Sequence, residues 1–280
     1  MTTWTVGRPE KITIDGAVRR LDVSLIRGKL NVIGAKGLAR VEIAVVGRKP
    51  LLVRHEGSTL MVSHAEQLRM PPFLWRLNPL AYLWHVEVSI AIPPEAFAAL
   101  RVATGSVVAS GLRRGADVEV RGGRISLLGI SGRVTAKAVD GAIEAVGVGG
   151  DLTVHTVDGD ITLVDLTADR VYARTVDGAI LCDLDHPASH VGLETADGAI
   201  TIRIREDSDI DVDLSAVDGK VSADIDELRP AKPPASRNSL IGTLGAGTGQ
   251  LRASTVDGNI TLLRRSVDNF DSPDDEGYSE

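Results

Sequence analysis

The 280-residue chain has little cysteine, few aromatic side chains and no long apolar run. Its one cysteine, Cys182, excludes an internal disulfide and is typical of a reducing compartment. No apolar stretch approaches the roughly 18 residues of a membrane-spanning helix. Residues 1–8 also lack the apolar core of a signal peptide. We therefore expect a cytoplasmic protein without a transmembrane segment.

Recognisable catalytic motifs are missing from the sequence as well. The serines form no Gly-x-Ser-x-Gly elbow. We expect Cys182 to be buried as a small apolar side chain, not exposed as a nucleophile. Residues Asp183 to His190 are the one stretch that resembles a metal site, and we expect a plain loop there. The sequence predicts no catalytic, cofactor-binding or metal-binding residue and no cofactor.

Charge is distributed unevenly along the chain, with a net value of −7. Residues 1–100 carry 13 basic and 8 acidic side chains, whereas residues 266–280 carry 6 acidic and no basic ones. The excess of acidic side chains repels the phosphate backbone of nucleic acids, so nucleic acid is not an expected partner. We predict that residues 266–280 form a disordered acidic tail.

A repeated pattern dominates the sequence: alternating apolar residues, an Asp-Gly pair, and alternating apolar residues again. Successive pairs are 18, 19, 20, 21 and 39 residues apart. Two upstream copies, Thr104-Gly105 and Gly122-Gly123, keep the glycine and lose the aspartate. Self-similarity with a period of about 20 residues predicts stacked repeats. The six pairs are Asp140-Gly141, Asp158-Gly159, Asp177-Gly178, Asp197-Gly198, Asp218-Gly219 and Asp257-Gly258.

Four positions around each Asp-Gly pair are apolar in all six repeats: six and four residues before the aspartate, and three and five after it. This alternation predicts strands with one buried face. Each repeat is then a strand, an Asp-Gly corner, a second strand and a second corner. The glycine supplies the positive φ of the corner, and the aspartate side chain is expected to accept hydrogen bonds from corner amides.

These features predict an all-β chain, and we favour a β-solenoid in which successive repeats stack in parallel. The alternative is a stack of antiparallel hairpins, because Asp-Gly is also a strong hairpin turn. Residues 21–32 match the repeat frame, and residues 51–62 match it with a slip of one residue. We therefore predict one repeat domain over residues 1–265, interrupted by insertions at 64–85 and 224–250, the latter a Gly/Pro/Ser-rich loop.

The strings Thr156-Val157-Asp158-Gly159-Asp160-Ile161 and Thr195-Ala196-Asp197-Gly198-Ala199-Ile200 resemble the bacterial repeat proteins known as putative adhesins, a domain family of unknown function. The resemblance covers residues 100–265 well and the N-terminal third loosely. It implies a β-solenoid of short stacked strands and says almost nothing about activity. Many relatives of that family are secreted or membrane-anchored.

The insertion at 64–85 concentrates aromatic and arginine side chains. Such residues anchor protein interfaces, so residues 70–84 are a candidate contact loop for a protein partner or for self-association. The structural alternative is a flap that covers the side of the solenoid, and a membrane surface is not an expected partner. The candidate contact residues are Phe73, Trp75, Arg76, Tyr82 and Trp84.

Taken together, the sequence favours a non-enzymatic scaffold for protein interaction. A first alternative is a filament, since solenoid ends expose unpaired strand edges. A second is a carbohydrate-active β-helix enzyme, which requires a cleft lined by carboxylates and aromatic rings. A calcium ladder on the aspartates is not expected, because calcium needs about six to eight oxygen ligands and each repeat offers one carboxylate.

Overall fold

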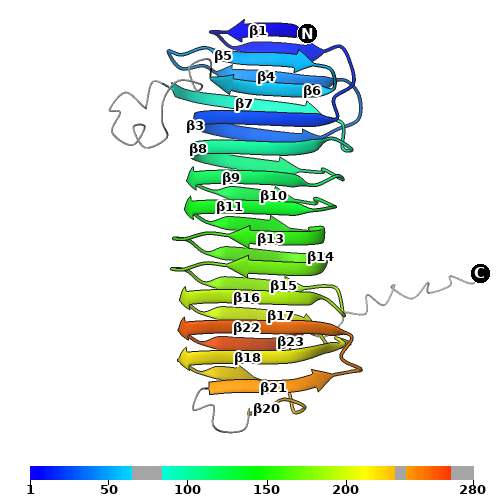
Figure 1. Cartoon of the computed structure of the whole chain (residues 1–280), viewed down its shortest axis with the longest axis vertical. Coiled ribbons are helices and arrows are strands. Elements are labelled where there is room, and N and C mark those ends of the chain that lie inside the picture. The colour runs from blue at the N-terminus through cyan, green and yellow to red at the C-terminus, as the bar shows by residue number, and fades with distance from the viewer. Residues whose placement is uncertain (65–83, 231–237, 266–280) are drawn as a thin grey trace, which may run out of the picture.

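The computed structural model describes residues 1–64, 84–230 and 238–265, which form a long rod of strands (Figure 1). The expectation of an all-β chain is confirmed, since the described residues form 23 strands and no α-helix. Accordingly, no helix in the described part of the chain could span a membrane.

Seven strands build the N-terminal part of the rod: β1 (Thr2–Val6), β2 (Glu10–Ile14), β3 (Arg20–Gly34), β4 (Ala39–Val45), β5 (Leu51–Glu56), β6 (Thr59–His64) and β7 (His85–Ile92). Ten strands build the middle: β8 (Phe97–Ser110), β9 (Ala116–Gly122), β10 (Ile125–Leu128), β11 (Val134–Asp140), β12 (Ile143–Val146), β13 (Gly149–His155), β14 (Ile161–Arg174), β15 (Ile180–Leu184), β16 (His190–Asp197) and β17 (Ile200–Arg205). Six strands complete the far end: β18 (Ile210–Asp218), β19 (Val221–Ala223), β20 (Arg229–Pro230), β21 (Asn238–Leu244), β22 (Gly249–Asp257) and β23 (Ile260–Arg265).

The repeats pair with one another in parallel and in register. In the strand before the corner, Val134 lies opposite Leu152. In the strand after it, Ile143 lies opposite Ile161. A two-residue hairpin would instead pair the two strands of one repeat across its own Asp-Gly corner, so the antiparallel alternative does not describe these repeats.

The apolar positions of the repeat form the core between the two ladders. All of those identified from the six Asp-Gly repeats are buried except Val221 and Ala223, which are partly buried. Both lie in β19, which among the described strands pairs with β23 alone. Burying apolar surface in this way is the main favourable term in folding.

The last two repeats are stacked out of chain order. Strand β22 lies between β16 and β18, so that Leu251 is opposite both Val191 and Val212. Its continuation β23 lies in the same way between β17 and β19. In Figure 1 the orange-red strands β22 and β23 accordingly lie inside the yellow-green part of the rod. The segment 249–265 is therefore inserted between two repeats that precede it in the sequence.

Two sequence interpretations are corrected by the strand pairing. Residues 51–62 do not continue the repeat frame, because β5 and β6 form an antiparallel hairpin around Gly57, whose φ is 59°. The insertion 224–250 is not a plain loop, because β20 and β21 lie within it and β21 pairs antiparallel with β18. Antiparallel strands thus lie at both ends of the rod.

Candidate functional site

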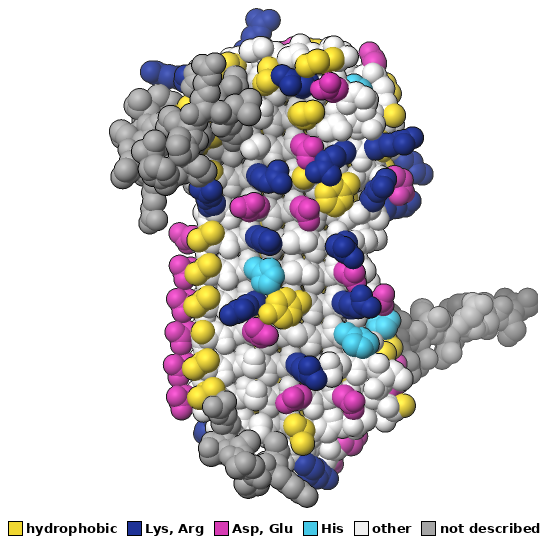
Figure 2. Space-filling model, viewed as in Figure 1, with side chains coloured by type: hydrophobic (Ala, Val, Ile, Leu, Met, Phe, Trp, Pro, Cys, Tyr) yellow, Lys and Arg dark blue, Asp and Glu magenta, His cyan; other side chains and the backbone are white. Residues whose placement is uncertain are grey.

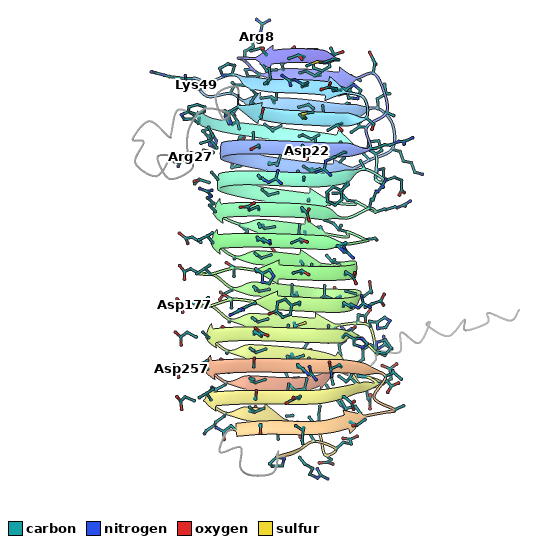
Figure 3. The ribbon with its side chains drawn as sticks, in the orientation of Figure 1. Arg8, Asp22, Arg27, Lys49, Asp177 and Asp257 are labelled. Carbon is teal, nitrogen blue, oxygen red and sulfur yellow. The ribbon has the colours of Figure 1, made fainter. Side chains whose placement is uncertain are left out.

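The six Asp-Gly corners stack into one continuous column along an edge of the rod. Direct bridges join the aspartates in the spatial order 140, 158, 177, 197, 257 and 218. All six aspartates are exposed. Asp177 and Asp257 point outward along the same edge (Figure 3).

The aspartate side chains do not build the corners, contrary to the sequence interpretation. The backbone does: the Gly159 amide donates to the Asp177 carbonyl, and the Asp177 amide donates to the Val157 carbonyl. Within the described residues, none of the six carboxylates accepts a hydrogen bond or forms an ion pair. The corner geometry therefore does not depend on a charged group at this position.

Threonine, which the sequence analysis did not single out, provides the side-chain bond at four corners. The hydroxyl of the buried Thr156 donates to the Gly141 carbonyl of the neighbouring corner, with 3.1 Å between the oxygens. Thr175, Thr195 and Thr255 make the same bond to Gly159, Gly178 and Gly198. The available signal was the threonine two residues before the aspartate in the three Thr-Val-Asp-Gly strings and in the Thr-Ala-Asp-Gly string at 195–198.

The corner glycines are required because neighbouring backbones touch at this column. A Cβ on Gly159 would lie 2.4 Å from the carbonyl oxygen of Gly141, and the φ of Gly159 is 152°. A Cβ added to any of the other five corner glycines would likewise lie 1.7–2.2 Å from the carbonyl oxygen of a neighbouring glycine. The glycine assignment thus has a steric basis in addition to the predicted positive φ, which Gly219 does not show.

A stripe of exposed valines runs beside the aspartates, and the two columns are visible at the left of Figure 2. These valines are between 39% and 51% exposed, whereas most of the other described valines are buried. We call the six pairs the Val–Asp edge, although one of them has the partly buried Ala196 in place of a valine. It consists of Val139-Asp140, Val157-Asp158, Val176-Asp177, Ala196-Asp197, Val256-Asp257 and Val217-Asp218.

The same column becomes basic toward the N-terminal end of the rod. Thr104 lies opposite both Arg27 and Gly122, and Gly122 lies opposite Asp140. Arg27 and Arg124 line a shallow hollow of about 670 Å³ that reaches Asp140. Arg27 is exposed and makes no ion pair with another described residue. The column therefore has a short basic part followed by a longer acidic part.

Most of the predicted contact loop lies outside the described residues, including Phe73, Trp75, Arg76 and Tyr82. Trp84 is described and half-buried, with its ring 5.3 Å from that of His64 and 5.5 Å from the Lys49 ammonium. His64 is buried, and this burial lowers its pKa to about 4. Strand β7 begins at His85 opposite Arg27, so the segment joins the rod at the edge that carries the corners.

A second surface feature is a hollow of about 420 Å³ on the face formed by β14, β16, β22 and β18. Gly192 lies within it, where a Cβ would be 3.0 Å from the ring of Tyr172. Glu194, Asp213 and Arg252 also line the hollow. Burial and the neighbouring Glu194 raise the pKa of Tyr172. The hollow combines a phenol ring and the imidazole of His190 with two carboxylates and a guanidinium.

The segment from Asp183 to His190 is only partly the loop that was expected. Asp183 ends up buried in β15, where its carboxylate pairs with Arg203 and, at 3.6 Å, with Arg265. His186 lies 3.7 Å from Asp169. Cys182 is fully buried, as predicted, and burial raises the pKa of its thiol to about 12.

Comparison with known proteins gives one family match and several distant structures. The model of the family Toastrack DUF4097 matches residues 102–263. No curated protein matches the chain. The similar solved structures share little sequence with it and have TM-scores below 0.5, so we draw no argument from them.

Three of these structures cover nearly the whole chain. A putative adhesin from Bacteroides fragilis is 12% identical, with 93% of this chain and 97% of that chain covered and a TM-score of 0.49. A putative cell adhesion protein from Clostridium sporogenes is 12% identical, with coverage of 92% and 100% and a TM-score of 0.27. A putative lipid binding protein from Parabacteroides distasonis is 8% identical, with coverage of 92% and 97% and a TM-score of 0.31.

Proposed function

Because the chain belongs to the Toastrack DUF4097 family, we propose that it is a non-enzymatic, adhesin-like β-solenoid scaffold. We propose further that it binds another protein through the Val–Asp edge. The family agrees with the resemblance of the Thr-Val-Asp-Gly strings. In this proposal each strand–corner–strand repeat is one turn of the solenoid, and residues 1–265 form a single repeat domain. The observation that carries the proposal is the edge itself, in which exposed valines and carboxylates are held in register.

The edge is suited to binding because its side chains are fixed before a partner arrives. Backbone bonds such as that from the Gly159 amide to the Asp177 carbonyl hold each corner without using the carboxylate. Rigid presentation lowers the entropy that is lost on association. An apolar stripe exposed beside unpaired charges is the arrangement found at interaction surfaces.

The predicted contact loop at 70–84 stays part of this proposal as a second contact. The insertion 64–85 that contains this loop begins at His64 in β6 and ends at His85 in β7, and both strands pair with β3. Replacing Phe73 and Trp75 with serine is expected to reduce any self-association seen by light scattering. A monomer both before and after the change would remove the loop from the proposal. A cytoplasmic location also remains proposed.

A capture experiment from lysate of the source cell tests the role of the edge. The immobilised full chain is compared with a Val157→Ser/Val176→Ser variant and with a Leu128→Ser/Leu181→Ser control. The control leucines are 40% and 43% exposed, like the valines, but lie away from the edge. We expect proteins that the native chain and the control retain and the edge variant loses. The same proteins on all three would overturn the proposal.

The hollow at Gly192 favours the carbohydrate-active enzyme as a second candidate. Glu194 and Asp213 supply two carboxylates beside the Tyr172 ring, and paired carboxylates are the usual catalysts of glycoside hydrolysis. The test is release of reducing ends from a panel of polysaccharides. Activity that Glu194→Gln and Asp213→Asn abolish would establish the enzyme, and no activity above the variants would exclude it for that panel.

The filament alternative rests on the strand edges at the ends of the rod. Among the described strands, β1 pairs with β5 alone, and β20 pairs with β21 alone. Both end strands are antiparallel to their neighbours, so end-to-end growth would need a different pairing from that inside the rod. Electron microscopy of the purified chain tests this alternative directly: filaments would support it, and isolated rods would reject it.

A further inference from the structure

We propose that the partner of the Val–Asp edge is a basic amphipathic helix of another protein, lying along the long axis of the rod. This inference rests on the interaction role proposed above and specifies the chemistry of the partner. It is argued from the apolar stripe, the charge of the neighbouring column and the spacing of the repeats.

Covering the valine stripe would contribute most of the favourable free energy of binding at the edge, because it is apolar and exposed to water. Five valines of the stripe are each 39–51% exposed. Val139, Val157 and Val176 follow one another from repeat to repeat, and Val256 and Val217 follow beyond Ala196. Removing apolar surface from water drives association. We call each Val–Asp pair of the edge, or the Ala196-Asp197 pair, a rung. Neighbouring strands are about 4.8 Å apart, so the six rungs span roughly 24 Å. The complementary surface is a straight apolar stripe of the same length.

The aspartate column decides the charge of the partner. Six exposed carboxylates follow one another with no ion-pair partner among the described residues. Carboxylates about 5 Å apart repel one another by about 0.8 kcal/mol per pair in water. Lysine or arginine side chains placed along the column would relieve this repulsion. Complementary charge also speeds encounter and fixes the orientation of the partner.

The rung spacing favours a helix over an extended strand. A helix presents a new turn every 5.4 Å, close to the spacing of the rungs, so about 16 residues would span the edge. Side chains on one face of a strand recur only every 6.6 Å or so, and fewer would meet a rung. A helix can also carry its apolar and basic side chains in adjacent stripes, which matches the two columns of the edge.

A second copy of this chain does not meet these requirements. If two edges paired in antiparallel orientation over the whole column, Arg27 would face Asp218, which is favourable. Asp158 would then face its own copy, and Asp140 would face Asp177. The central carboxylates would remain uncompensated, since the basic part of the column is shorter than the acidic part. The partner must therefore supply its own positive charge.

Three synthetic peptides of about 16 residues test the inference by fluorescence anisotropy with the full chain at about 0.15 M salt. The first is a helical peptide with leucines on one face and lysines beside them. In the second, glutamate replaces lysine. In the third, two central prolines prevent the helix. We expect only the first to bind well, with the proline peptide at least about tenfold weaker, because side chains must lie in the helical stripes to meet both columns.

Matched protein variants localise the binding. Asp158→Asn/Asp177→Asn/Asp197→Asn should weaken the lysine peptide about tenfold, through loss of three exposed ion pairs. Asp117→Asn/Asp213→Asn/Asp224→Asn removes the same charge away from the edge and should change affinity less than about twofold. Val157→Ser/Val176→Ser should weaken binding, whereas Leu128→Ser/Leu181→Ser should not. Cooperative thermal unfolding at a temperature no lower than that of the native chain confirms that each variant is folded.

Several outcomes would overturn the inference. Equal loss in both aspartate variants would indicate general attraction to an acidic protein. Equal affinity for the proline peptide would indicate an extended partner. Dimerisation lost in the edge variants would identify a second copy instead. Should the lysine peptide fail while edge-dependent capture from lysate succeeds, the helix would be wrong and the scaffold role would stand.

Discussion

The hydroxyl of Thr175 donates a hydrogen bond to the carbonyl oxygen of Gly159, 3.1 Å away in the neighbouring corner. Thr175 is 1% exposed, so this bond is shielded from water. It links two repeats through a side chain at the point where the chain reverses direction. Three other threonines repeat the arrangement, and together the four stabilise the column that carries the Val–Asp edge.

Thr175→Val should lower the free energy of unfolding by about 1–2 kcal/mol, because the shape is kept and the Gly159 carbonyl loses a buried donor. Chemical denaturation measures the change. The matched control is Thr162→Val, a half-buried threonine on the outer side of β14 with no hydrogen bond to a described residue through its hydroxyl. Equal effects at the two sites would contradict the role assigned to the corner threonines.

Gly159→Ala should destabilise the rod by about 2–4 kcal/mol, because its Cβ would overlap the Gly141 carbonyl and the backbone would have to shift. Gly122→Ala is the control, since Gly122 takes the aspartate position of another corner and has open space around its Cα. Thermal unfolding distinguishes them. An unchanged melting temperature for Gly159→Ala would mean that the corners do not touch as described.

Asp158→Asn/Asp177→Asn/Asp197→Asn should raise the melting temperature by about 2–4 °C at low salt, because three like charges leave a crowded column and no bond is lost. The gain should shrink in about 1 M salt, where charges are screened over a few ångströms. Differential scanning calorimetry at both salt concentrations is the measurement. A loss of stability would show that the carboxylates hold the corners after all.

Arg265→Leu should destabilise the chain by about 1–3 kcal/mol, since the buried Asp183 and Asp185 each lose one of their arginine partners. Arg265 belongs to β23, so hydrogen exchange should accelerate most over residues 249–265. Arg252→Leu, on the outer face of β22, serves as the control. Exchange that accelerates evenly over the whole rod would argue against a local anchor.

The pKa of His64 predicts a loss of stability in mild acid. Burial lowers this pKa from 6.5 to about 4, so the unfolded chain binds the proton more tightly than the folded one. Stability is therefore complete above pH 6.5 and falls by up to about 3 kcal/mol as the pH drops toward 4. In His64→Asn this part of the pH dependence should vanish, whereas His190→Asn at the surface should retain it.

Much of the architecture could be predicted because the apolar residues that form the core recur in the sequence with the period of the repeat. The alternating apolar positions identify the strands, and each Asp-Gly pair identifies a corner. The role of the aspartate could not be read in the same way, because an Asp-Gly pair is compatible with either side-chain or backbone bonding. The backbone bonds leave the carboxylates free, and this makes the edge a candidate site.

The order of the last repeats could not be predicted from the pattern. Leu251 and Val212 occupy equivalent positions, so either could stack on Val191 with the same burial. The spacing of 39 residues before Asp257 indicates an insertion but not where the following repeat lies. What distinguishes the two orders is outside the repeat: β21 covers β18, and Arg265 reaches Asp183 and Asp185.

This inserted segment has a consequence for how the molecule is made. A ribosome releases residues 210–223 before residues 249–265, yet the finished rod places the later segment deeper. Residues 210–223 must therefore stay detached until residues 249–265 have stacked on β16 and β17, or they first pair with β16 and β17 and are then displaced. The stacking of this end can therefore be completed only after residues 249–265 have been made.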